Sequence, residues 1–449
     1  METPYSIKKG EQSRLLHVID ISDPANPLRV YTHQFTSSDG IPRDVAVCKN
    51  EVAVAVTSPI RDVYEGHVYF FQLFAPGDTE LKSDGKVPVG PFPDMLTFNP
   101  QCSQLWVANE GRPGKDIANK FMDPVGSVTV IERETTGNPT ERFITFGDFE
   151  NRFDLRMPSR YVAQNVWPLA GNPTFQQDAE PEYITFDSKN AYVAFQKNNA
   201  IATIPLRTLT ATMTPIPAKE WNNLKIDPSD RDGGIHLREY PFRSLRQPDT
   251  IKTLTIGSRS FLVTADEGRT TSYTSSLHGF NWNDYSLADV LARGSKYDDL
   301  SIKNDSFISD LRLDNKAGRM TVSKVDGLNL FTQKYDQAYH FGGRGFSIWD
   351  TRNFNLIYDT GDEIEKEIST SNPNGPKIGA LDVITDNGNT YIVAGSETVG
   401  TVFLYSVNTT SGAPVPTFEA AIRLGRTDFV WQELYDMDEA GDAGISAVG

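Results

Sequence analysis

The stretch from residue 178 to residue 206 constrains the fold most, because it has the pattern of one complete repeat unit. It contains three short β-rich runs in which apolar and polar residues alternate, separated by turn residues at 187–190 and 197–199. Such runs at short, regular spacing predict an antiparallel meander. One meander cannot bury both of its faces, so the chain must place further copies beside it.

Further copies are present along the whole chain. Complete units are predicted at 42–87, 93–150, 181–217, 248–268, 318–360 and 378–424. Residues 15–22 and 28–35 form half a unit, and residues 442–448 have the pattern of a strand that begins another. A closed ring removes exposed sheet edges, so the two ends are expected to share one blade.

The sequence therefore predicts an all-β fold, a single β-propeller over residues 1–449 with about seven four-stranded blades. Insertions are expected at about 151–180, 218–247 and 269–317, where loops on a rigid scaffold carry binding surfaces. Within them only residues 285–293 have the apolar spacing of a short helix.

Charge limits the classes of partner. The net charge of −16 argues against nucleic acid or an anionic membrane and favours a cation. The alternative is that acidic residues only keep the chain soluble. No signal peptide, anchor or membrane-spanning run is visible, so we expect either a cytosolic chain or a mature or trimmed fragment, without membrane insertion.

The two cysteines occupy equivalent positions in neighbouring units. Aligning the units that begin at residues 42 and 93 places Cys48 and Cys102 in the same turn. Neighbouring turns can bring such residues within disulfide reach, which would indicate an oxidising compartment. Two unrelated thiols are the alternative.

Acidic residues recur where first strands begin. In a propeller these positions face the central channel, and they are occupied by Asp44, Asp94, Glu180, Glu182 and Asp249. Converging carboxylates repel one another unless a hard cation such as calcium lies among them. The alternative is that each carboxylate caps a turn or accepts a bond from a neighbouring backbone.

A second calcium candidate lies in one loop. Asp227, Asp230 and Asp232 precede two glycines, and closely spaced carboxylates followed by glycine suit an oxygen cage, although the loop is not an EF-hand. A solvated Asp/Gly turn is the alternative.

Catalytic signatures are weak. Glutamates or aspartates recur at the ends of second strands, at Glu110, Asp266, Glu267 and Glu397, but a paired-carboxylate hydrolase needs two of them close together with one raised pKa. The six histidines show no zinc motif, and no nucleophile elbow or phosphate loop is present. Arg344 and Arg238 are the candidate anion-binding residues, with a role in holding blades together as the alternative.

Several motifs together resemble a known family. They are LHVIDISDPANP, PDMLTFNPQCSQLWVANEG, DAEPEYITFDSKNAYVAFQKNNAIA, DRDGGIHLREYPFRSLRQPDTI and FGGRGFSIWD. The chain is similar to the mesenchyme-specific cell-surface glycoproteins of biomineralising animals and to the bacterial choice-of-anchor I family. The resemblance implies an extracellular or surface-attached propeller, often glycosylated and associated with calcified matrix, whereas some bacterial relatives are labelled phosphatase-like. This chain departs from the family pattern at residues 375–379 and 444–446, where a glutamate is lost.

These observations favour an extracellular or cell-surface, calcium-binding, non-catalytic matrix glycoprotein related to biomineralisation. Sequons at Asn304 and Asn408 are compatible with glycosylation. Expected partners are calcium, mineral or matrix components, other proteins or copies of the chain itself. The alternatives are a calcium-dependent phosphoesterase and a scaffold that self-assembles through an unfinished terminal blade.

Overall fold

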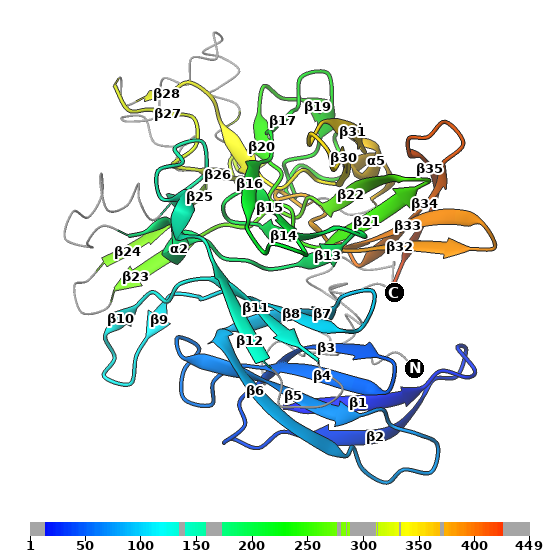
Figure 1. The fold of residues 1–449 in the computed structure, drawn as a ribbon. Coiled ribbons are helices and arrows are strands. Elements are labelled where there is room, and N and C mark those ends of the chain that lie inside the picture. Colours follow the sequence, from blue (N-terminus) through cyan, green and yellow to red (C-terminus); the bar gives the residue numbers. More distant parts are fainter. Residues whose placement is uncertain are drawn as a thin grey trace. The chain divides into compact units, whose positions relative to one another are not determined.

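The computed structural model describes residues 14–133, 140–158, 173–275, 280–283, 285–287, 311, 313–331, 334–368 and 372–424. Within these residues the fold is all-β and consists mainly of four-stranded antiparallel sheets (Figure 1). The chain divides into two compact units. The first unit comprises Met1–Phe153, Val162–Val193 and Ala202–Met213, and the second comprises Asp154–Tyr161, Ala194–Ile201 and Thr214–Gly449.

The first unit contains two complete sheets and one strand pair. The pair is β1 (Leu15–Asp20) with β2 (Leu28–Gln34). The first sheet runs in chain order through β3 (Pro42–Cys48), β4 (Glu51–Val56), β5 (Glu65–Gln72) and β6 (Ser83–Pro91). The second has the same order through β7 (Pro93–Phe98), β8 (Gln104–Asn109), β11 (Ser127–Glu132) and β12 (Thr140–Thr145).

Shorter elements of the first unit lie between and after these strands. A hairpin of β9 (Gly114–Lys115) and β10 (Phe121–Met122) is inserted between β8 and β11. The 3-10 helix η1 (Gly147–Phe149) follows β12, and the single-turn helix α2 (Phe175–Asp178) precedes the next strand. A further four-stranded sheet follows in chain order, with β13 (Ile184–Phe186), β14 (Asn190–Phe195), β15 (Ala200–Pro205) and β16 (Thr212–Pro215). Its residues up to 193 and from 202 to 213 belong to the first unit, and the rest belong to the second.

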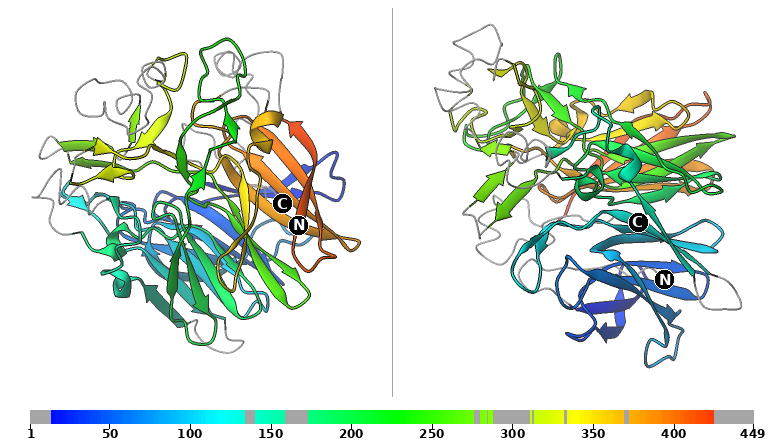
Figure 2. Two further views of the ribbon diagram at one scale, coloured as in Figure 1. Left: turned by 90° about the horizontal axis from the view of Figure 1, so that it is seen from above. Right: turned by 60° about the vertical axis from the view of Figure 1, so that its left-hand side comes forward.

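The core of the first unit lies between its sheets. Strand β4 is buried on both faces after its first residue, and β8 has the same pattern, as expected of inner strands covered by neighbouring sheets. Apolar side chains from both sheets form one cluster that includes Ala53, Phe70, Val89, Leu96 and Val107. Figure 2 shows the two sheets, blue and cyan, side by side. Burial of this shared surface is what makes the repeats stable next to one another.

The second unit also contains two complete antiparallel sheets. One has the order β21 (Ile251–Ile256), β22 (Arg259–Ala265), β30 (Phe346–Asp350) and β31 (Leu356–Asp359). The other runs through β32 (Ile378–Asp386), β33 (Asn389–Ser396), β34 (Thr401–Asn408) and β35 (Val415–Arg423). They share a buried cluster that includes Phe261, Val263, Phe346, Leu381 and Phe403.

The second unit also contains a mixed sheet, built from two strands that precede β21 and three strands that lie between β22 and β30 in the chain. Its five strands are, in order, β17 (Lys219–Glu220), β20 (Arg243–Leu245), β29 (Tyr339–Phe341), β26 (Thr321–Ser323) and β25 (Tyr285–Leu287), and β20 pairs in parallel with β29. Three strand pairs and a short helix complete the unit. They are β18 (Lys225–Ile226) with β19 (Arg238–Glu239), β23 (Ser272–Ser275) with β24 (Phe280–Asn283), β27 (Leu328–Asn329) with β28 (Lys334–Tyr335), and α5 (Glu363–Glu367).

The predicted meanders at 42–87, 93–150, 181–217 and 378–424 are confirmed as four-stranded sheets. The prediction of separate units at 248–268 and 318–360 is wrong, because β22 pairs with β30 of the second stretch. The strands β26 and β29 of that stretch belong to the five-stranded sheet instead. The predicted helix at 285–293 is wrong at its beginning, where β25 pairs with β26; residues 288–293 lie outside the described residues. Residues 442–448 also lie outside them, and the number of blades and the shared terminal blade stay predictions.

Helices in the described part of the chain are short, and none has the length and apolar character needed to cross a membrane.

Candidate metal centre

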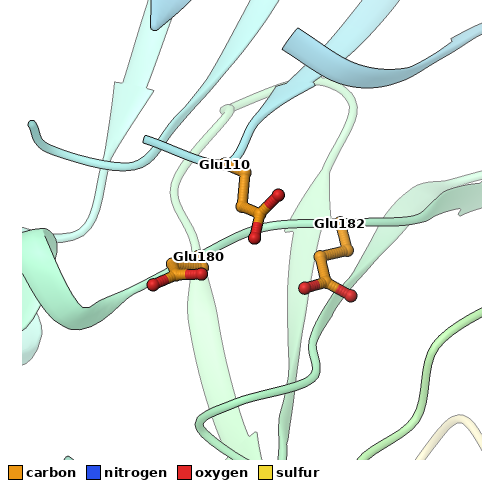
Figure 3. A group of neighbouring side chains, drawn as sticks. All are labelled: Glu110, Glu180 and Glu182. Carbon is orange, nitrogen blue, oxygen red and sulfur yellow. The ribbon is translucent and has the colours of Figure 1, made fainter. Parts of the chain in front are cut away.

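Glu110, Glu180 and Glu182 are the only three potential metal ligands that come together within the described residues. One carboxylate oxygen from each lies within 4.8 Å of the others. The three residues are 0%, 3% and 1% exposed, and Figure 3 shows their carboxylates facing a common space. Glu180 and Glu182 belong to the predicted ligand set, whereas Glu110 is predicted only as one of the acids at the ends of second strands and not as a partner of these two.

Packing between neighbouring repeats explains this convergence. Glu110 directly follows β8, and its backbone N–H donates to the carbonyl oxygen of Phe92 at 2.9 Å. Glu180 and Glu182 lie in the extended link between α2 and β13. Trp106 of β8 packs edge-to-face on Phe186 of β13 with ring centroids 5.6 Å apart. The end of one repeat's second strand is therefore held beside the beginning of the next repeat.

A glycine allows the link to approach closely. The backbone N–H of Gly126 donates to the carbonyl oxygen of Gln176 at 2.9 Å. A Cβ atom added to Gly126 would lie 1.8 Å from the carbonyl oxygen of Ala179, which no side chain can tolerate. Only glycine therefore permits the chain before β11 to lie against the residue preceding Glu180.

The donor set fits a hard divalent cation. All three groups offer carboxylate oxygens, which calcium prefers over the nitrogen and sulfur ligands of softer metals. Oxygens bound to one calcium ion are at most about 4.6–5.2 Å apart, twice the metal–oxygen distance, and the three carboxylate oxygens lie within 4.8 Å of one another. Arg112 forms an ion pair with Glu110, and its guanidinium lies 4.2 Å from the ring centre of Phe92.

The other predicted first-strand acids are placed outside this group. Asp94 accepts a 2.7 Å ion pair from Arg43, and the backbone N–H of Asp249 donates to the carbonyl oxygen of Ala265 at 2.9 Å. Asp44 accepts a 2.9 Å hydrogen bond from the backbone N–H of Leu96, and burial raises its pKa to about 6.

The three aspartates of the 227–232 loop do not form a three-ligand group in the structure. Asp227 is buried and accepts from the backbone N–H groups of Ser229 and His236, both at 3.2 Å; burial raises its pKa. Asp230 instead pairs with Arg319 at 3.0 Å. Asp232 lies in the same loop, and calcium binding there stays a prediction.

The remaining second-strand acids fall into two groups in the second unit. Asp266 is buried and pairs with Arg246 at 3.0 Å. Glu267 interacts with Glu397, and burial followed by repulsion from Glu267 raises the pKa of Glu397 to about 7. The side chain of Gln196 donates to Glu267.

The candidate anion-binding arginines differ in exposure. Arg344 is 1% exposed and donates to the Glu365 carboxylate at 2.7 Å and to the carbonyl oxygen of Pro373 at 2.6 Å. This places Arg344 inside the unit, in the structural role that sequence analysis gave as the alternative. Arg238 is exposed in β19.

The two cysteines and one sequon are also described. Cys48 and Cys102 are joined by a disulfide with Cα atoms 5.9 Å apart, which links the end of β3 to the turn between β7 and β8. Asn408 is exposed at the end of β34, and its side-chain oxygen accepts from Thr410. Asn304 lies outside the described residues.

These features define an all-β repeat protein with a buried acidic centre at the junction of two repeats. Comparison with known proteins gives the family: the model of the choice-of-anchor I domain matches residues 2–410, so the chain belongs to the choice-of-anchor I family.

Curated relatives include two animal proteins. The chain is 27% identical over 341 residues to the mesenchyme-specific cell surface glycoprotein of Strongylocentrotus purpuratus, a match that covers 64% of this chain and 42% of that protein. It is 26% identical over 153 residues to Gigasin-3a of Magallana gigas, covering 29% of this chain and 53% of that protein. The chain thus spans about half the length of the curated relatives it matches.

Solved structures show only distant likeness. The Malassezia sympodialis allergen Mala s 1 has 9% identity and a TM-score of 0.35, covering 88% of this chain and 86% of the allergen. The Cps50 (Swd1) β-propeller domain from Myceliophteria thermophila has 10% identity and a TM-score of 0.31, covering 86% of this chain and 88% of that domain.

Proposed function

We propose that this chain is a calcium-binding, non-catalytic protein of the cell surface or extracellular matrix, and that it folds as a propeller of about seven blades. Support for the propeller comes from the repeated four-stranded meanders and from apolar clusters shared by successive sheets. Among the described residues β1 and β2 form a two-stranded sheet, which supports a terminal blade completed by another segment of the chain.

The calcium proposal rests on one observation, the convergence of three buried carboxylates at Glu110, Glu180 and Glu182. Taking charges out of water is costly, and like charges this close repel one another. A divalent cation among the three oxygens reverses the sign of that interaction, so calcium binding would stabilise the native arrangement.

Three features support a surface or extracellular location. The animal relatives include a protein named as a cell surface glycoprotein, and the disulfide between Cys48 and Cys102 suits an oxidising environment. The exposed Asn408 sequon supports glycosylation. We infer that bound calcium connects the chain to mineral, to matrix components or to other proteins.

The proposed role is non-catalytic, and Arg112, the cationic side chain beside this centre, forms an ion pair with Glu110. The buried Arg344 is bonded to Glu365, so it is not positioned to hold a phosphate group. A phosphoesterase would need cations and an accessible anion-binding residue in one open site.

Calcium titration by calorimetry, paired with thermal unfolding in calcium or chelator, tests the proposal. We expect binding and an increase in Tm with calcium, both lost in Glu182→Gln, because a neutral amide removes one anionic ligand. Asp230→Asn is the matched control, because Asp230 lies in the other candidate loop and pairs with Arg319.

Loss of calcium binding in Asp230→Asn, with normal binding in Glu182→Gln, would move the site to the 227–232 loop. Absence of binding at millimolar calcium would reject the calcium proposal altogether.

A further inference from the structure

The second unit contains a buried charge network that the proposed function does not use. Lys219, Arg246, Asp266 and Asp359 contribute two positive and two negative charges. Lys219 pairs with Asp359 at 2.9 Å, and Arg246 bridges Asp266, at 3.0 Å, and Asp359. The side chains of Lys219, Arg246 and Asp266 are 3%, 4% and 1% exposed. Burying four charges is costly, even when they are paired.

Lys219 is fixed by three acceptors. Its Nζ donates to the carbonyl oxygens of Gly343 and Gly361, both at 2.7 Å, and the third acceptor is Asp359. A neutral amine has two N–H bonds and one lone pair in place of the three N–H bonds of an ammonium group. With both N–H bonds directed at the glycine carbonyls, the lone pair would face the Asp359 carboxyl group.

Burial opposes the charged forms of the amine and the carboxyl group, whereas their neighbours favour them. The Trp221 ring centre lies 4.3 Å from the Lys219 Nζ, a cation–π contact that favours the ammonium form, and the Arg246 guanidinium lies 5.4 Å from the ring centre of Trp349. Burial lowers the pKa of Lys219, although Asp359 opposes the shift. Burial also favours the neutral acid at Asp359, but Lys219 and Arg246 hold its pKa below its ordinary value, so the reactants begin as an ion pair.

From this geometry we propose that Lys219 and Asp359 become joined by an intramolecular amide bond, with the loss of one water molecule. A proton first moves from Nζ to Oδ1 of Asp359. The Nζ lone pair then attacks Cγ, and the negative charge that develops on Oδ2 lies against the Nη1 donor of Arg246. The Cγ–Oδ1 bond breaks as a second proton from Nζ reaches Oδ1, and water leaves.

The reaction balances without another reagent. The ammonium and carboxylate supply three protons on nitrogen; two leave with Oδ1 as water and one stays on the amide nitrogen. One positive and one negative charge disappear together, and the ion pair between Arg246 and Asp266 remains. The product therefore keeps the network neutral and removes two of its buried charges, which lowers the desolvation cost.

The bond would join two sheets of the second unit. Lys219 begins β17 of the five-stranded sheet, and Asp359 ends β31 of the neighbouring four-stranded sheet. Glycine at position 343, whose carbonyl oxygen accepts from Lys219, allows its backbone to lie against Asp266, because an added Cβ would lie 2.7 Å from the Cβ of Asp266. A covalent link between residues 219 and 359 would close a loop that contains the excursion between β22 and β30, and it would restrict the unfolded chain.

Intact mass spectrometry of the denatured, reduced chain provides the test. We expect the wild-type chain to be lighter than its sequence by one water, and Lys219→Arg to have its full sequence mass. Asp359→Asn should lose ammonia instead of water, so that its cross-linked product and that of the wild type have the same mass. Lys366→Arg is the control, because Lys366 is exposed and pairs with Asp362 at 2.6 Å; it should still lose water.

Peptide mapping separates this bond from other dehydrations. A digest should contain a branched peptide that joins the segment around Lys219 to the segment around Asp359. A wild-type chain at full mass, or a water loss that persists in Lys219→Arg, would overturn the proposal and leave the network as ion pairs alone. The wild-type measurement needs no variant, so it stays decisive even if Lys219→Arg fails to fold.

Discussion

The same repeat position carries a glutamate in both units, but its surroundings differ. In the first unit, residues 108–111 read Ala-Asn-Glu-Gly, and in the second, residues 265–268 read Ala-Asp-Glu-Gly. Glu110 meets two further carboxylates, Glu180 and Glu182. Glu267 meets Glu397, accepts from Gln196, and lies 3.7 Å from the Lys377 Nζ.

This difference shows how one repeat position supports two kinds of chemistry. The end of the second strand fixes where the glutamate lies, and its own loop and the neighbouring repeat together determine how its charge is balanced. Near Glu110 the loop supplies Arg112, and the neighbour adds two carboxylates, which favour a divalent cation. Near Glu267 it adds a lysine and a carboxyl group that binds a proton readily, because burial and Glu267 raise the pKa of Glu397.

The largest expected effect separates the two glutamates by their response to calcium. At a calcium concentration of 100 times Kd, a native-state site adds about 2.7 kcal/mol to the free energy of unfolding. We expect this gain in the wild type and in Glu267→Gln, but not in Glu110→Gln. Chemical denaturation with calcium or chelator measures it. Equal calcium responses in the two variants would remove the distinction between the glutamates.

The next effect concerns pH and Glu397. Its pKa is about 7 in the folded chain against an ordinary 4.5, so between these values the folded state holds a proton that the unfolded state has lost. The free energy of unfolding therefore falls as pH rises through this window, by about 2 kcal/mol after allowance for partial exposure.

Glu397→Gln should flatten this part of the stability profile, since the amide does not titrate. Denaturation midpoints between pH 4 and 8 measure the slope, and Glu239→Gln, at an exposed position in β19, is the control. An unchanged slope in Glu397→Gln would assign the titration to another group.

The sequence predicts the individual sheets well because local patterns determine them. Alternation and turn residues locate β13 and β14, whose register runs from Ile184 against Val193 to Phe186 against Ala191. The same reasoning wrongly separates residues 248–268 from residues 318–360. The strand β30 pairs with β22, but a long excursion separates the two strands in the sequence. Alternation marks a strand but does not identify a distant partner.

The sequence predicts the acids of the candidate site one by one but does not predict that they meet. The acids before β13 are recognised because they begin a repeat, and Glu110 is recognised as the end of another. Their meeting depends on packing between repeats, through Trp106 and Phe186, and one repeat alone does not contain that information. The recurring Ala-x-Glu-Gly sequence, aligned with the start of the following repeat, is the signal that would have joined them.

The smallest expected effect concerns Lys377, the lysine beside Glu267. Lys377 favours the ionised form of Glu397, so Lys377→Gln should raise the pKa of Glu397 further and shift the fall in stability to higher pH. The shift should be less than about one pKa unit, because a partly exposed ion pair contributes about 0.2–1 kcal/mol and one unit corresponds to about 1.4 kcal/mol.

Lys252→Gln is the matched control for Lys377→Gln, since Lys252 pairs with Asp382 at 2.9 Å and is 40% exposed. The pH of the stability transition should move in Lys377→Gln and stay in place in Lys252→Gln. A shift to lower pH would mean that Lys377 does not stabilise the carboxylates. Protonation of Glu397 would then be what reduces the negative charge beside Glu267. The contrast with Glu110 would depend on Glu397 alone.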